Sequence, residues 1–98
     1  MTRLTAEEIG PRLAALPGWT VQAGQLNKTF VVRSFAHGSL FIGAIAQLAE
    51  AANHHPDVCL HDYNQVTIDL ATHSEGGLTA KDFALAERIE VLPHKPLK

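Results

Sequence analysis

Apolar and polar residues recur along this chain with the two periods that mark helices and strands. Helical spacing appears in three stretches, which follow Thr5, Ser34 and Thr79. The alternation typical of strands appears in two stretches between them, residues 19–33 and 58–72. The pattern therefore predicts the order helix, two strands, helix, two strands, helix.

The first helical stretch opens with a capping box, in which a Thr hydroxyl and a Glu carboxylate pair across the first turn. Thr5 and Glu8 have the required spacing, and apolar residues follow at helical intervals. Pro11 conflicts with a continuous helix, because it lacks an N–H and clashes with the preceding turn. We expect a kink there, or a short turn followed by a helix that begins near Pro11. Pro17-Gly18 ends the segment.

A hairpin is expected next, with strands over residues 19–23 and 26–33 and a tight turn at Gly24-Gln25. The second strand places Lys28 among apolar residues on one face and Val31 among polar residues on the other. This imperfect alternation leaves open which face is buried.

The central helix is predicted from about Phe35 to Ala52, with Ser34 as its N-cap. Asn53 suits the left-handed position just after a helix, and Pro56 prevents the helix from continuing. The residues expected on its buried stripe are Phe41, Ile45, Leu48, Ala49 and Ala52.

The second half of the chain repeats the hairpin-then-helix arrangement. Residues 58–60 are a short strand candidate, 61–64 a turn, and 65–72 the clearest strand. Thr79 caps the last helix, with Asp82 as the reciprocal partner three residues later. Hairpins rather than long crossovers join the strands in each pair. We therefore expect an α+β fold, with an antiparallel four-stranded sheet and helices on one face.

Length and composition fit a single domain over residues 1–98. Hydrophobic residues make up 46% and charged residues 18%, which excludes a disordered chain. A net charge of −2 argues against nucleic acid as a partner, and no apolar stretch is long enough for a membrane span. The acidic start lacks the apolar core of a signal peptide, and the single cysteine, Cys59, fits a reducing compartment. We expect a cytoplasmic protein.

Histidine is the unusual residue type, with six in 98 residues and four of them between positions 54 and 73. His54 and His55 lie on irregular backbone ahead of Pro56, where two neighbouring rings can address one ligand, although a bare His-His pair is more often two exposed loop residues. His73 ends the clearest strand, on the face opposite its apolar residues, as either a working group or a solvated side chain. Asp82 has a complete structural role as a cap, and spacing alone favours that role over catalysis.

A metal site is a weaker alternative. The residues of ligand type are His54, His55, Cys59, His61, His73 and Asp82. No pair has the usual spacing of a zinc site, and the apolar neighbours of Cys59 disfavour a thiolate nucleophile. His37 and His94 have no partner and are expected to be exposed, while Trp19 is expected in the core. A cluster of imidazoles and one carboxylate, without a cofactor or metal, suits a reaction that needs only proton transfer, such as a dehydration or isomerisation.

The chain resembles the pterin-4a-carbinolamine dehydratases over nearly its whole length. The segments that carry the resemblance are Asn53-His54-His55-Pro56-Asp57, Tyr63-Asn64-Gln65-Val66, Leu70-Ala71-Thr72-His73 and Gly77-Leu78-Thr79-Ala80-Lys81-Asp82. One departure is a stretch between Pro56 and Tyr63 that is one residue longer than in the animal enzymes, with Val58 in place of an aromatic residue.

The resemblance implies a lyase that removes water from a 4a-hydroxytetrahydropterin left by an aromatic amino acid hydroxylase, giving the quinonoid dihydropterin. It implies four active-site residues, which are His54, His55, His73 and Asp82. It also implies a pterin pocket lined by His54, His55, Pro56, Thr72, His73, Ser74 and Glu75, no bound cofactor or metal, and a homodimer or homotetramer. We expect His54 and His73 to exchange protons with the substrate, His55 to hold the ring or stabilise the developing cation, and Asp82 to orient a histidine.

A protein-binding module on the same fold is the alternative. Some members of the family serve as dimerisation cofactors of a transcription factor or as assembly factors for a carbon-fixing enzyme. Relatives that have given up catalysis tend to have lost active-site histidines, whereas this chain keeps all three. The resemblance therefore favours the enzyme.

Overall fold

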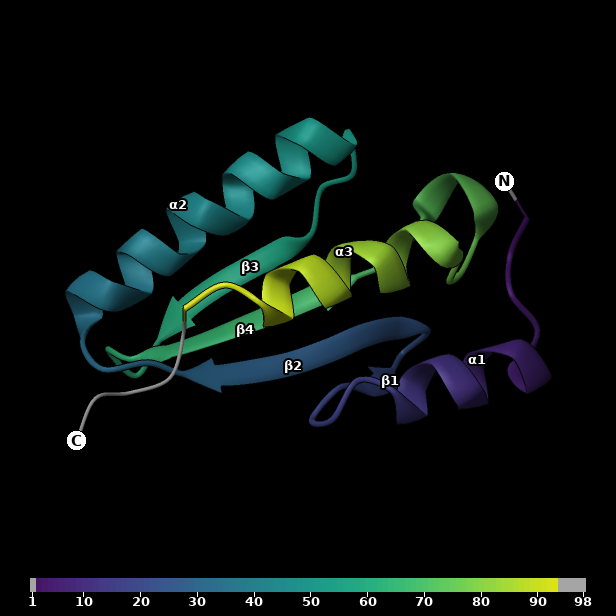
Figure 1. Ribbon diagram of the computed structural model, residues 1–98, viewed down its shortest axis with the longest axis horizontal. Helices are drawn as coiled ribbons and strands as arrows, with labels where there is room; N and C mark the ends of the chain where they lie inside the picture. Colours follow the sequence, from purple (N-terminus) through teal and green to yellow (C-terminus); the bar gives the residue numbers. More distant parts are fainter. Residues whose placement is uncertain (1, 94–98) are drawn as a thin grey trace.

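The computed structural model describes residues 2–93 and confirms the predicted order of elements (Figure 1). The helices are α1 (Ala6–Ala14), α2 (Phe35–Ala52) and α3 (Ala80–Glu90). The strands are β1 (Thr20–Gln22), β2 (Gln25–Val31), β3 (Asp57–His61) and β4 (Gln65–Leu70). A short 3-10 helix, η1 (His73–Glu75), joins β4 to α3 and was not predicted.

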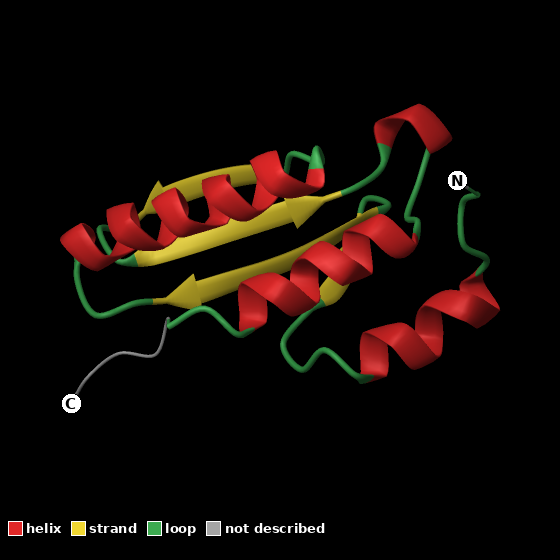
Figure 2. Cartoon of the chain, turned by 45° about the horizontal axis from the view of Figure 1, so that its top comes forward, coloured by secondary structure: helices red, strands yellow, loops and turns green. Residues whose placement is uncertain are grey.

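All neighbouring strands are antiparallel, and their order β1-β2-β4-β3 places β2 and β4 at the centre. Helices α2 and α3 lie across one face of this sheet, with α1 beside β1 (Figure 2). The expected α+β fold, with an antiparallel four-stranded sheet and helices on one face, is therefore confirmed. Within residues 2–93, no helix combines the length and hydropathy needed to cross a membrane.

The hydrophobic core fills the space between the sheet and the helices. Strand β4 contributes Val66, Ile68 and Leu70 from one face, which confirms its predicted alternation. The other buried apolar side chains of the core cluster are Leu16, Trp19, Leu26, Phe30, Val32, Phe41, Ile45, Leu78, Phe83, Leu85, Ala86 and Ile89. Gly38 lets α2 approach β3 closely, because a Cβ there would lie 2.7 Å from a methyl group of Leu60.

Lys28 explains the imperfect alternation of β2. It lies on the core face, where its ammonium pairs with the Glu90 carboxylate, donates to the Pro17 carbonyl at 3.1 Å and stacks 4.5 Å from the centre of the Phe30 ring. Glu90 also accepts from the indole N–H of Trp19 at 2.8 Å. A cation is tolerated among apolar residues here because each of these contacts compensates its lost hydration.

None of the described helices covers the opposite face of the sheet, which carries polar rows across the strands. The Asn27 amide donates to the Asp69 carboxylate at 2.8 Å, and His61 Nε2 lies 2.7 Å from the Thr67 hydroxyl. Cys59 is exposed on the same face, directly opposite Thr67 in the β3–β4 pair. This polar face is consistent with the alternation of an antiparallel sheet wetted on one side.

Helix α1 begins at Ala6, so the alternative in which a helix begins near Pro11 was wrong. The capping box of Thr5 and Glu8 is present, and the helix runs without interruption from Ala6 through Pro11 to Ala14. Pro11 removes the hydrogen bond to the Glu7 carbonyl, and Glu7 is exposed, so solvent can satisfy that oxygen. A helix of nine residues on the surface tolerates the loss.

Three smaller expectations were wrong. The first hairpin turns at Ala23-Gly24, one residue earlier than predicted, because both positions take positive φ and Gly suits the second. Ala52 is exposed, since the last turn of α2 leads away into Asn53 and is not covered. His37 is half-buried, and its Nδ1 lies 3.0 Å from the Ser34 hydroxyl that caps α2. His94 falls outside the described residues.

Candidate active site

The end of α2 fixes the position of His54. Asn53 has φ 49° and ψ 46°, the left-handed conformation expected from the sequence. The N–H of His54 donates to the Ala49 carbonyl at 3.0 Å and that of Asn53 to the Glu50 carbonyl at 3.2 Å. This is the Schellman arrangement, which closes the helix and reverses the chain. The two histidines therefore begin the segment that returns toward β3.

The connection from β4 to α3 supplies the other side of the site. Thr72 pairs with Gly77 in an isolated antiparallel bridge, which closes the loop that contains η1. Thr72 is buried and His73 is exposed at the start of η1, so their side chains point to different environments. The loop thereby holds Thr72 against α3 and leaves His73 open to solvent.

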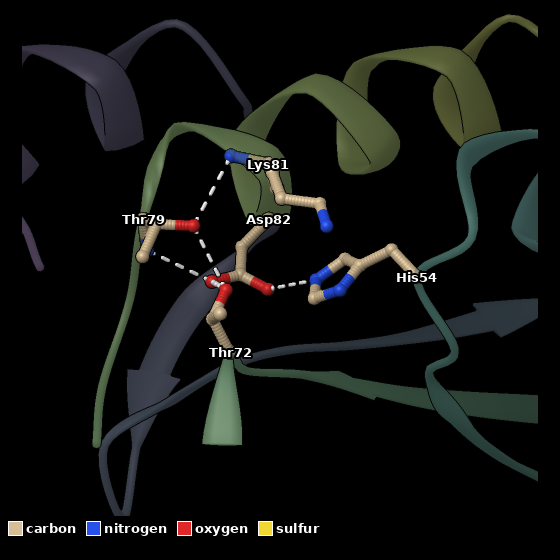
Figure 3. Close-up of polar contacts among 5 residues, drawn as sticks. All are labelled: His54, Thr72, Thr79, Lys81 and Asp82. Carbon is tan, nitrogen blue, oxygen red and sulfur yellow. Dashed lines mark hydrogen bonds and ion pairs between the residues drawn. The ribbon is translucent and has the colours of Figure 1, made fainter. Parts of the chain in front are cut away.

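Asp82 is fully buried, and its carboxylate joins the two segments (Figure 3). One oxygen, Oδ2, accepts from the Thr79 backbone N–H and from the Thr72 hydroxyl, both at 2.9 Å. The other, Oδ1, lies 2.5 Å from His54 Nε2. Asp82 therefore serves as the predicted helix cap and contacts a predicted site histidine as well. One oxygen therefore belongs to the cap of α3, and the other contacts a histidine predicted for the site.

The threonine hydroxyls around Asp82 have fixed directions. Thr72 has a single hydroxyl proton and donates it to Asp82, so the Thr79 hydroxyl donates to Thr72 Oγ1, 2.8 Å away. Thr79 Oγ1 in turn accepts from the N–H of Lys81 at 3.3 Å. The buried polar groups around the carboxylate are thus satisfied, and no buried side-chain nitrogen or oxygen within residues 2–93 lacks a partner.

The Asp82 contact also determines which nitrogen of His54 carries the proton. A carboxylate has no proton to give, so His54 Nε2 donates to it. In the neutral ring Nδ1 then keeps its lone pair. No hydrogen bond to Nδ1 is formed within the described chain, and the atom is not sealed from solvent. His54 is therefore a nearly buried imidazole held in the tautomer of a proton acceptor.

His55 diverges from His54 although the two are adjacent. Its Nε2 lies 2.5 Å from the Glu50 carboxylate on the last turns of α2, and 59% of its side chain is exposed. Glu50 is itself exposed, so this contact is screened by solvent and contributes little to stability. Its effect is to direct the His55 ring.

A hollow of about 290 Å³ opens between the segment that follows α2 and the connection from β4 to α3. Its lining residues are Asn53, His54, His55, Ala71, Thr72, His73, Ser74 and Lys81. The structure thus brings the three predicted site histidines, with Thr72 and Ser74, to one cavity. Asp82 does not line the hollow and reaches it only through His54.

Two residues expected around the pocket lie elsewhere. Pro56 lines a neighbouring apolar groove between α2 and β3, together with Val58 and His55. Glu75 is exposed on η1 and is not among the residues that line the hollow. The longer stretch after Pro56 is taken up by β3 and a tight turn at Asp62-Tyr63, where both residues have positive φ.

Lys81 and Glu50 are the contributors that sequence reasoning missed. A lysine in the first turn of a helix is an unfavourable position for a cation, and this signal was available in the sequence. Glu50 lies five residues before His55, a spacing that predicts no contact on a helix.

Within residues 2–93, no three His, Cys, Asp or Glu side chains are grouped so that they could hold a metal ion. Cys59 and His61 belong to the other face of the sheet.

The chain is similar to known proteins over most of its length. The family model described as pterin 4 alpha carbinolamine dehydratase matches residues 2–92. A protein of Roseiflexus sp. (strain RS-1), provisionally named a pterin-4-alpha-carbinolamine dehydratase, is 48% identical over 89 residues, which are 91% of this chain and 95% of that protein.

Two solved structures are also similar. A transcriptional coactivator/pterin dehydratase from Brucella melitensis superposes with a TM-score of 0.84 at 35% identity, covering 91% of this chain and 96% of that one. A pterin dehydratase-like protein identified as a RuBisCO assembly factor in the alpha-carboxysome gives a TM-score of 0.65 at 27% identity, covering 80% of this chain and 92% of that one.

Proposed function

Because this chain belongs to the pterin 4 alpha carbinolamine dehydratase family, we propose that it dehydrates a 4a-hydroxytetrahydropterin to the quinonoid dihydropterin. Such a reaction recycles the pterin cofactor of an aromatic amino acid hydroxylase. The observation that carries the proposal is the hollow lined by His54, His55 and His73, with the tautomer of His54 set by a buried carboxylate. Its volume is at the small end of ligand pockets, as a compact bicyclic substrate requires.

The reaction needs one acid and one base. The C4a–O bond breaks, the hydroxyl leaves as water after gaining a proton, and the neighbouring ring nitrogen loses its proton as the C4a–N double bond forms. His54 Nδ1, with its lone pair free, is the base in this proposal. His73, exposed at the start of η1, delivers the proton to the leaving hydroxyl from the other side of the hollow.

His55 and Asp82 support these two groups. His55 contacts the pterin ring, with its orientation maintained by Glu50. Asp82 is a positioning residue, because its side chain is fully buried and acts on the substrate only through His54. Thr72 and Ser74 complete the wall of the pocket. No oxidant or reductant is needed, since the step moves only protons and a hydroxyl group.

Purified protein tests the proposal directly with synthetic 4a-hydroxytetrahydropterin, whose dehydration is followed by absorbance. We expect the protein to accelerate quinonoid formation, and His73→Ala to lose most of the acceleration. General acid–base catalysis of this kind typically contributes about 10²–10⁴-fold. His61→Ala is the matched control, because it removes a histidine from the opposite face of the sheet. Equal activity of His73→Ala and the unaltered protein would refute the mechanism.

Protein binding is the second candidate function, favoured by the similarity to a RuBisCO assembly factor. The helix-free polar face of the sheet offers a surface on which binding would not obstruct the hollow. We also expect the chain to form a homodimer or homotetramer, which light scattering would measure. Pull-down followed by size-exclusion chromatography tests for a stable partner. A protein that forms such a complex and has no dehydratase activity would favour the binding function.

A further inference from the structure

Lys81 is the only permanently charged side chain among the residues that line the hollow. It is half-buried, and its ammonium forms no hydrogen bond or ion pair with any residue between 2 and 93. The backbone N–H of Lys81 donates to the Thr79 hydroxyl, so that contact does not involve the ammonium. Figure 3 draws the side chain extending from the first turn of α3 on the side of His54.

The fold itself gives no reason for a lysine at this position. Lys81 is the second residue of α3, where the helix dipole is positive and a cation is unfavourable. Partial burial without a compensating acceptor adds to the cost. The neighbouring Asp82 uses both carboxylate oxygens on other partners. A residue that weakens its own helix and faces a cavity is better explained by what the cavity binds.

The chemistry of an ammonium group limits what that ligand must present. Lysine offers three donors and no acceptor, so it requires an acceptor on the substrate. On the pterin of the proposed function, the 4-oxo oxygen is a strong acceptor on the carbon next to the reacting C4a. We propose that Lys81 binds this 4-oxo oxygen and thereby orients the ring, so that C4a lies between His54 and His73. This inference rests on the proposed function and adds a group that selects 4-oxo over 4-amino pteridines.

A pair of ligands that differ at this one group tests the inference. Calorimetry would measure the binding of 6-methyl-7,8-dihydropterin and of its 4-amino analogue to the full chain at pH 8. For Lys81→Met we expect affinity for the 4-oxo ligand to fall about tenfold, as for a lost hydrogen bond to a charged group. Affinity for the 4-amino ligand should not change. Lys81→Arg should restore much of the difference, because it keeps a charged donor.

Two further measurements show whether a loss of affinity comes from the missing ammonium contact, and not from lower stability or a changed net charge. Lys81→Met should melt at the same temperature as the unaltered chain or slightly higher, since it removes a cation from the start of a helix. Arg88→Met is the matched control, because Arg88 is exposed on the same helix outside the hollow and its loss changes the net charge equally. It should leave both affinities unchanged.

The possible failures are distinguishable. Equal loss of affinity for both ligands, or no loss for either, would overturn the role of Lys81 while leaving dehydratase activity in place. An unaltered protein that neither binds the 4-oxo ligand nor dehydrates the carbinolamine would overturn the proposed function and this inference together. In the dehydration assay, Lys81→Met should lower kcat/KM about tenfold, since it loses both the 4-oxo contact and the orientation of the ring that the contact provides.

Discussion

Replacing Asp82 by Asn separates the two roles of this carboxylate. An amide has one acceptor oxygen, and that oxygen can take the place of Oδ2, which accepts from the Thr79 N–H and the Thr72 hydroxyl. The NH₂ group then faces His54 Nε2, where Oδ1 was. Two donors cannot pair, so His54 has to accept at Nε2 and carry its proton on Nδ1. The variant is therefore expected to keep its cap and to lose the base.

The cost to stability follows from the number of contacts that change. A hydrogen bond to a charged group contributes about 1.5–3 kcal/mol and a neutral one about 0.5–1.5 kcal/mol, so weakening the cap costs roughly 1 kcal/mol for each of the two bonds. Removing a buried charge recovers part of this. A net loss of about 1–2 kcal/mol corresponds to a melting temperature lower by roughly 4–16 °C in a domain of this size. The loss of dehydratase activity should be larger, about 10²-fold or more.

The assay combines three measurements on Asp82→Asn, which are the melting temperature, the dehydration rate below that temperature and the ¹⁵N chemical shifts of the His54 ring. Thr79→Ala is the matched control, because it removes a capping hydroxyl, costs about 1 kcal/mol and leaves the contact between His54 and Asp82 intact. We expect this control to lose stability but to keep its activity and the Nε2-protonated ring. If both variants lost activity in proportion to their stability, Asp82 would be only a cap.

Three further outcomes follow from the structure. His55→Ala should lower the dehydration rate with little change in melting temperature, because its side chain is largely exposed; a fall in stability of more than about 1 kcal/mol would contradict the placement. Trp19→Phe should lower the melting temperature by several degrees through loss of the hydrogen bond to Glu90, and calorimetry should show this while the dehydration rate stays unchanged. Glu8 has its pKa lowered from 4.5, chiefly by the backbone N–H of Thr5, so its contribution to α1 should be present above that pH and lost as the pH falls through the folded-state value. NMR titration of the Glu8 carboxylate measures this, and an unshifted midpoint would contradict the capping box.

The fold could be predicted in detail because its local signals agree with one another. Ser34 and Thr79 each cap the start of a helix with a side-chain hydroxyl, and Asn53 ends α2 in the left-handed conformation, so each signal acts within a few residues. A helix that begins near Pro11 was wrongly expected as one alternative, because α1 is short and exposed and the Glu7 carbonyl can be satisfied by solvent. Lys28 could not be placed, because its partners Glu90 and Pro17 are distant in sequence.

The candidate site could be predicted only in part, because local patterns indicate where residues leave regular structure but not which distant side chains they contact. The resemblance supplied the residues, and the backbone pattern indicated that His54 and His73 leave regular structure at points where side chains can converge. Spacing could not reveal that Asp82 uses one oxygen for its helix and the other for His54, because that contact spans 28 residues. Lys81 was overlooked because a cation in the first turn of a helix was not considered as a sign of function.

The single cysteine on the helix-free face has a practical consequence. Cys59 is exposed on the polar face of the sheet, opposite Thr67, and is not among the residues that line the hollow. A maleimide fluorophore attached there would respond to a molecule that binds the polar face of the sheet and would leave the hollow unmodified. One labelled sample could therefore report binding on the polar face by fluorescence and the expected dehydration by absorbance. No cysteine would have to be introduced for the label.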